Sequence, residues 1–308
     1  MPQSPLSRRE FVHASSLALA AGVLGGASNA RAQPEPAPMA SNRGVIFKSV
    51  KFGMIGVKGS YEDKFKALKD LGYDGIECDS PSGHPVPAVR DAAAKVGLPI
   101  HGVVDSTHWN IRLSDPKPEV REKGLRDLLT AIRDCNALGG YSVLLVPGHG
   151  KDGTVEEVEQ RSLEMIRMAL PTAAKLGVRI LLENVWNHMF YDHSGPGDQT
   201  ADRFAAFIDR CNSPWVGAHY DVGNHRKYGV PSKWARTLGH RIAKLDLKDY
   251  NHTTQKWADI GEGTVDWAEL RTVLKEIGYT GWAVAEVGGG DVARLKTIAE
   301  QMDRVLDL

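Results

Sequence analysis

The chain has 308 residues, in which 38 Lys and Arg balance 38 Asp and Glu. This balance leaves no net field to attract nucleic acid or an anionic membrane surface, which argues against both as partners. Three scattered cysteines, Cys78, Cys135 and Cys211, match neither a zinc site nor a disulfide framework. We expect them to be small buried hydrophobic residues.

The first 32 residues have the pattern of a twin-arginine signal peptide. The pair Arg8-Arg9 precedes an uncharged stretch over residues 12–29 and a small-residue cleavage motif. A membrane anchor is the alternative, but polar residues interrupt the stretch, and it is shorter than a membrane span of about 20 residues. We therefore expect export to the periplasm by the twin-arginine pathway, with no membrane attachment after cleavage. Residues 33–48 are expected to form a disordered mature N-terminus.

From residue 49 onward, short apolar runs alternate with amphipathic helical patterns, most of which end in Gly shortly before the next run. The expected strands cover residues 51–57, 75–79, 100–104, 142–147, 179–184, 216–222, 241–248 and 281–287. Eight strands, the intervening helices and a closing helix predict an α/β fold, a single-domain (β/α)8 TIM barrel over residues 49–308. A doubly wound open sheet is the alternative, which the lack of a G-x-G-x-x-G or Walker loop disfavours.

An acid stands at the carboxyl end of each of the last four expected strands. These acids are Glu183 in LLEN, Asp221 in HYDVGN, Asp246 in KLDLKD and Glu286 in AVAEVGGG. An acid in a strand that is buried on both faces needs a cation or hydrogen bonds to compensate it. If the four acids converge, they form an oxygen-rich site suited to a divalent metal.

These segments, together with GEGTVDW at residues 261–267, resemble the sugar phosphate isomerase/epimerase family with its xylose isomerase-like TIM barrel. The resemblance covers about residues 50–308 and implies a divalent metal held by the four acidic positions. Many relatives carry His where this chain has Asp246. An all-oxygen ligand set favours Mn or Mg, with Co or Zn as alternatives. Asn224 is a second departure, at a position where family members often carry His.

The resemblance also implies how such a site acts on a sugar. Glu183 and Glu286 would flank the substrate, and one of them would remove a proton from the carbon beside a carbonyl that the metal polarises. Period-two alternation places Lys248 on the same face as Asp246, so Lys248 is a candidate to stabilise a developing enolate. The alternative for Lys248 is a surface position or a pair with Asp249.

His108 and Trp109 follow the third expected strand, at the barrel mouth. Trp109 suits stacking on a sugar ring, and His108 suits substrate contact or acid–base catalysis, with a capping or structural role as its alternative. Further candidates for sugar binding lie in loops or at strand ends near the same mouth: His149, Trp186, His188, His219, Asn224 and Glu262. Glu77, inside the second strand, is a candidate to orient a site residue, whereas His101 is expected in the core.

The leading interpretation is a metal-dependent isomerase or epimerase that abstracts a proton beside a carbonyl. A non-phosphorylated sugar or keto-sugar is the expected partner, because no Lys/Arg cluster or Gly-rich loop marks a phosphate site. One alternative is a lyase or hydratase acting on 3-keto-glycosides, and another is a non-catalytic exported sugar-binding barrel. An endonuclease is disfavoured because the chain has no basic face. The oligomeric state is open, with a homo-oligomer among the options.

Overall fold

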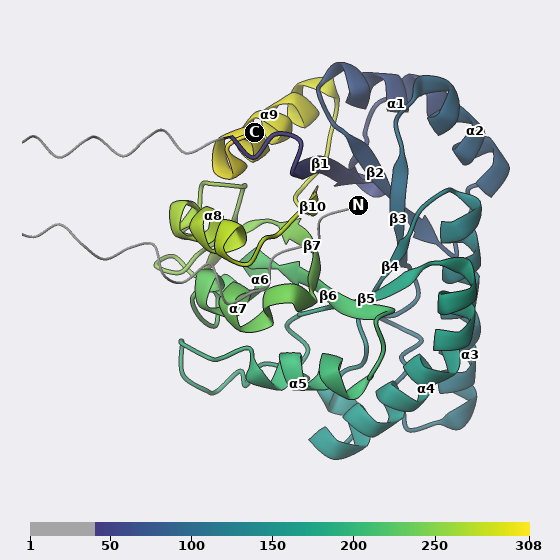
Figure 1. Ribbon diagram of the computed structural model, residues 1–308, viewed down its shortest axis with the longest axis vertical. Coiled ribbons are helices and arrows are strands. Elements are labelled where there is room, and N and C mark those ends of the chain that lie inside the picture. The colour runs from purple at the N-terminus through teal and green to yellow at the C-terminus, as the bar shows by residue number, and fades with distance from the viewer. Residues whose placement is uncertain (1–40) are drawn as a thin grey trace, which may run out of the picture. The chain divides into compact units, whose positions relative to one another are not determined.

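The computed structural model describes residues 41–308 (Figure 1). The expected signal peptide and residues 33–40 of the expected disordered segment lie outside the described residues. Within the part of the chain that is described, no helix combines the length and the apolar character needed to cross a membrane.

Eight parallel strands form the predicted closed barrel, hydrogen-bonded in the order β1-β10-β7-β6-β5-β4-β3-β2 (Figure 1). The strands are β1 (Ile46–Lys51), β2 (Gly75–Ser80), β3 (Ile100–Asp105), β4 (Ser142–Leu145), β5 (Arg179–Glu183), β6 (Val216–Asp221), β7 (Ile242–Leu247) and β10 (Gly281–Ala285). The helices, most of which lie outside the ring, are α1 (Tyr61–Asp70), α2 (Val86–Val96), α3 (Pro118–Ala137), α4 (Val155–Leu176), α5 (Asp202–Arg210), α6 (Val222–Arg226), α7 (Pro231–Leu238), α8 (Trp267–Glu276) and α9 (Val292–Leu306). The prediction of a single-domain (β/α)8 barrel is confirmed.

The strands are buried on both faces, as expected for strands between a packed barrel interior and a layer of helices. All side chains of β4 are buried, and in β5 only Arg179 is partly exposed. Local signals start the helices: α1 begins with a capping box of Ser60 and Asp63, and α4 with one of Thr154 and Glu157. Because all eight strands are parallel, their carboxyl ends meet at one end of the barrel, which we call the mouth.

The first strand lies earlier than expected. The sequence predicted it at residues 51–57, whereas β1 covers Ile46–Lys51 and a 3-10 turn covers Phe52–Met54. Parallel pairing with β10 begins at the first residue of β1 and decides this register. Residues 46–48, which were expected in the disordered segment, therefore belong to the barrel. As a result, Lys51 lies at the carboxyl end of its strand.

A two-stranded hairpin follows β7 and was not expected from the sequence. Its strands β8 (Asp249–Asn251) and β9 (Lys256–Ala258) pair antiparallel. The hairpin carries Trp257, whose ring centroid lies 5.1 Å from the Nζ atom of Lys248 at the end of β7. The insertion therefore brings an aromatic side chain to the barrel mouth.

Candidate active site

The four acids predicted from the strand ends converge at the barrel mouth. One carboxylate oxygen from each lies within 4.8 Å of the others, and we call this set the acid cluster: Glu183, Asp221, Asp246 and Glu286. Strand register accounts for the convergence, because Asp221 pairs directly with Asp246 between β6 and β7. Asp221 and Asp246 have no exposed surface, whereas the side chain of Glu286 is 30% exposed. Glu286 is therefore the acid most accessible to a ligand.

Two lysine ammonium groups lie against the acid cluster. Lys51 Nζ is 2.9 Å from Asp246 Oδ2 and 2.5 Å from Glu286 Oε1. Lys248 Nζ is 2.7 Å from Asp221 Oδ2 and also contacts Glu286. Burial lowers the pKa of each lysine, but the surrounding carboxylates outweigh burial and raise both pKa values. Both ammonium groups therefore stay charged beside the four acids.

The two glutamates of the cluster hold their protons with different strengths. Burial, and then the charge of Glu286, raises the pKa of Glu183 well above its ordinary value. Burial also opposes ionisation of Glu286, but Lys51 and Lys248 outweigh burial and lower the pKa of Glu286 well below its ordinary value. Glu183 thus holds its proton more strongly than Glu286 does, which is the arrangement of an acid beside a base.

The acid cluster fits a divalent cation. Its ligand atoms are carboxylate oxygens, the donors that Mg and Mn prefer. Asp221 Oδ2 and Asp246 Oδ1 are buried and make no directed hydrogen bond, although nitrogens of Lys248 and His219 lie within 3.0 Å. The cluster holds four acids but only two lysines, so ionisation of all four acids would leave an excess of two negative charges, which a divalent ion would neutralise. The four residues thus form a candidate metal site.

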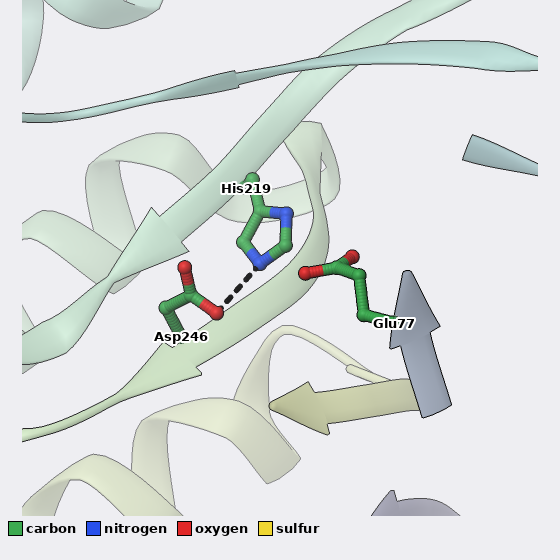
Figure 2. Close-up of side chains that lie close together, drawn as sticks. All are labelled: Glu77, His219 and Asp246. Atoms are coloured by element: carbon green, nitrogen blue, oxygen red, sulfur yellow. Dashed lines mark ion pairs between the residues drawn. The ribbon is translucent and has the colours of Figure 1, made fainter. Parts of the chain in front are cut away.

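A second group of polar side chains lies one layer deeper in the barrel. Figure 2 shows His219 between Glu77 and Asp246, with its Nε2 atom 3.0 Å from Asp246 Oδ1. Lys244 Nζ is 3.0 Å from Glu77 Oε1 and 2.6 Å from His101 Nδ1. All members of this group are less than 5% exposed, and we call it the buried polar layer: Ser49, Glu77, His101, His219 and Lys244.

His219, which we predicted to bind sugar, belongs to this deeper layer. It precedes Asp221 by two positions, so its side chain faces the barrel interior below the mouth. With no exposed surface, His219 orients Asp246 instead of reaching a sugar. Glu77, His219 and Asp246 also bring three potential ligand atoms within 4.8 Å, but Lys244 already supplies a positive charge beside Glu77.

An open pocket of about 530 Å³ adjoins the acid cluster at Glu286. Its lining residues are Lys248, Trp257, Ala258, Asp259, Glu286, Val287 and Gly288. Trp257 is half exposed and stacks on Trp186 with a ring separation of 4.4 Å and an interplanar angle of 16°. The two tryptophans form an aromatic platform beside Glu286, of a kind that suits the apolar face of a sugar ring.

Two other predicted residues lie close to the acid cluster. Asn224 donates its backbone N–H to Asp221 Oδ1 at 2.7 Å and its side-chain amide to Glu183 Oε1 at 3.3 Å, so Asn224 orients both acids. His108 is buried, and its Nδ1 accepts the backbone N–H of Val146 at 3.3 Å. Burial, and then the charge of Lys51, lowers the pKa of His108 to about 3, which keeps the imidazole neutral.

The remaining predicted sugar-binding residues have other contacts. Glu262 is exposed and pairs with Arg304 of α9 at 2.6 Å. His149 accepts the N–H of Lys151 and caps a short 3-10 turn. His188 stacks on His193 at 3.5 Å. Trp109 is 48% exposed and contacts His108 edge-on.

Lys51 and Trp257 are site residues that the sequence analysis missed. Lys51 follows Ser49 by two positions in IFKSVK, so the correct strand boundary would have placed it at the mouth. The QKWAD segment carries no strong hairpin signal, which left Trp257 unassigned.

The fold and the site together define a TIM barrel with carboxylates, lysines and an open pocket at the carboxyl ends of its strands, where enzymes of this fold carry their active sites. The chain belongs to the xylose isomerase-like TIM barrel family, whose model matches residues 65–308. The family resemblance seen in the sequence is thereby confirmed.

Several proteins similar to this chain in sequence or structure are sugar epimerases. An L-ribulose-5-phosphate 3-epimerase, UlaE of Escherichia coli, is 23% identical over 232 residues, which is 71% of this chain and 79% of the relative. D-allulose 3-epimerase from Methylomonas sp. matches with a TM-score of 0.68 and 19% identity, covering 85% of this chain and 98% of that one. 3-keto-D-glucoside 4-epimerase YcjR from E. coli matches with a TM-score of 0.68 and 16% identity, covering 85% of this chain and 100% of that one. The structural matches show the fold, and the expectation of an isomerase or epimerase agrees with these relatives.

Proposed function

We propose that the protein is a sugar isomerase or epimerase that moves a proton at the carbon beside a carbonyl. The observation that carries the proposal is the pair Glu183 and Glu286, which share one cluster while their pKa values are shifted in opposite directions. Two neighbouring carboxyl groups whose pKa values are shifted apart are suited to act as acid and base. The sugar epimerases among the relatives support the same reaction class.

In this proposal Glu286 is the base, because it is ionised and faces the pocket. Glu183, whose pKa is raised, is the acid that returns a proton to the intermediate. Lys248 lies beside Glu286 and stabilises negative charge that develops on the substrate oxygen, while neutral His108 is a further hydrogen-bond donor. A divalent ion, Mn or Mg in preference to Co or Zn, would be held by the acid cluster and would polarise the carbonyl.

The substrate proposed for this site is a non-phosphorylated sugar or keto-sugar. Among the pocket-lining residues, Lys248 is already paired with acids, and Glu286 would repel a phosphate. The charge of Asp259 is paired with Arg294, whose two terminal guanidinium nitrogens lie 2.6 and 2.7 Å from the carboxylate oxygens. Trp257, which lines the pocket and stacks on Trp186, offers an apolar surface to a sugar ring instead.

Incubation with Mn and candidate ketoses or 3-keto-glycosides in deuterated water tests the proposal. Deuterium should enter at the carbon beside the carbonyl, and Glu286→Gln should slow this exchange by about a hundredfold or more. Glu276→Gln is the matched control, because Glu276 is exposed on α8 and pairs with Arg236. Equal exchange by the wild type, Glu286→Gln and Glu183→Gln would refute the assignment.

The same experiment separates the alternative functions. A lyase or hydratase acting on 3-keto-glycosides would also exchange the proton but would release a product that has lost its leaving group. A non-catalytic sugar-binding barrel would bind sugar without exchange. Mass spectrometry of the products distinguishes these cases from an isomerase or epimerase.

We also propose that the protein is exported to the periplasm through the twin-arginine pathway. The Arg8-Arg9 pair before an apolar stretch supports this proposal. Replacing both arginines with lysine should retain the precursor in the cytoplasm, as cell fractionation would show, and unchanged export would contradict it.

A further inference from the structure

Lys51 lies in the candidate metal site although the sequence pattern did not point to it. It ends β1, and its side chain is only 15% exposed. Within residues 41–308 its ammonium group donates hydrogen bonds to Asp246 and Glu286. Both acceptors belong to the acid cluster, so the positive charge of Lys51 is directed at proposed metal ligands.

The contacts of Lys51 use oxygens that a divalent ion would also need. Both oxygens of Glu286 face ammonium groups, Oε1 that of Lys51 and Oε2 that of Lys248. Asp246 has Lys51 Nζ 2.9 Å from Oδ2 and His219 Nε2 3.0 Å from Oδ1. A divalent ion bound to these two acids would share their oxygens with a lysine, and like charges on one carboxylate repel.

Lys248 differs from Lys51 in one respect. Its Nζ also lies 5.1 Å from the ring centroid of Trp257, so part of its environment is the aromatic platform at the pocket. The hydrogen bonds and ion pairs of both lysines are made with the acid cluster. Lys51 bridges Asp246 and Glu286, so a metal ion bound to these two acids would have to replace its contacts.

We propose that Lys51 is an internal competitor of the metal ion: its ammonium group occupies oxygens of Asp246 and Glu286, and a divalent ion binds the acid cluster by displacing it. Lys51 therefore weakens metal binding and keeps the ion exchangeable. This inference rests on the proposed role of the acid cluster as the metal site. It assigns Lys51 a positioning role, without contact to the sugar.

Isothermal titration of the purified full chain with MnCl₂ measures the competition directly. Lys51→Met preserves the length of the side chain and removes its charge, and it should bind Mn at least about tenfold more tightly than the wild type. Thermal melts give a second readout that needs no substrate. Because a ligand that binds the folded state raises its stability according to its affinity, Mn should raise the Tm of Lys51→Met more than that of the wild type.

Lys227→Met is the matched control. Lys227 directly follows α6, at the mouth, and its Nζ lies 4.0 Å from the ring centroid of Trp186, so the variant removes the same charge without touching the acid cluster. Its Mn affinity should equal that of the wild type within about twofold. Should Lys51→Met fail to fold, Lys51→Gln carries the same test, because it is neutral and keeps a hydrogen-bond donor.

Mn affinity and Tm increments equal to those of the wild type, or weaker binding by both neutral variants, would overturn the competition. If neither the wild type nor the variants bound Mn or Mg, the inference would also be wrong. The deuterium exchange experiment would then decide the proposed enzyme function separately, since it follows the proton and not the metal.

Discussion

The acid cluster and the buried polar layer use similar residue types, one above the other in the same barrel, but they balance charge differently. In the buried polar layer a single acid, Glu77, pairs with a single lysine, Lys244, and no member is exposed beyond 5%. In the acid cluster four acids face two lysines, and Glu286 opens onto the pocket. The deeper layer is shielded from solvent and its acid and lysine balance in charge, whereas the acid cluster has more acids than lysines and can bind a cation.

Close packing accounts for the sealed character of the deeper layer. A Cβ atom at Gly102 would lie 2.5 Å from Lys244 Nζ and 2.7 Å from the carbonyl oxygen of Ser142. Only glycine leaves room for the ammonium group at this point of β3. The layer therefore packs beneath the mouth, and its member His219 contacts Asp246 of the acid cluster through Nε2.

The largest expected effect comes from breaking the balanced layer. Lys244→Met leaves the fully buried Glu77 without its cation, which should cost about 3–5 kcal/mol of the free energy of unfolding. Urea denaturation followed by circular dichroism measures the loss. Lys66→Met is the control, since its exposed pair with Asp70 should contribute less than about 1 kcal/mol. Equal losses in the two variants would show that the deeper layer is not a tightly coupled charge pair.

A second prediction concerns how the affinity of the acid cluster for Mn depends on pH. Burial, only partly offset by Lys248, raises the pKa of Asp221 to about 8, so its carboxyl is protonated at pH 6. Because a metal binds the ionised form, protons compete with it below pH 8. Mn affinity should therefore rise at least about tenfold from pH 6 to pH 8 and level off above that. Titrations at several pH values check this, and a flat profile would contradict it.

The smallest expected effect concerns the aromatic platform of the open mouth. Trp257→Ala should weaken sugar binding by about 1 kcal/mol, seen as a higher KM, while Tm changes little because the side chain is half exposed. Trp109→Ala is the comparison, since Trp109 is equally exposed but does not line the pocket. A larger rise in KM for Trp109→Ala would favour the residue chosen from sequence over the one chosen from structure.

The acids of the cluster were predictable because each interrupts an apolar strand, where an uncompensated charge is costly. Lys51 was missed because the apolar run KFGMIG suggested a strand starting five residues too late. His219 was expected to bind sugar, but it lies in the buried polar layer, because period-two alternation tells which face a residue shares but not how deep it lies. Trp257 was missed because its hairpin is an insertion without a strong turn signal.

By itself, the sequence determined the barrel, its element order and the acids at the ends of the last four strands. Local signals carry that information: apolar runs, helix-ending glycines and charges where strands should be apolar. The tertiary structure alone decided that Lys51 and Lys248 lie against these acids and that the pKa values of Glu183 and Glu286 are shifted in opposite directions. Both outcomes depend on burial and on distances between residues far apart in the chain. Charges interact through space, and their interaction becomes stronger where the surrounding protein excludes water.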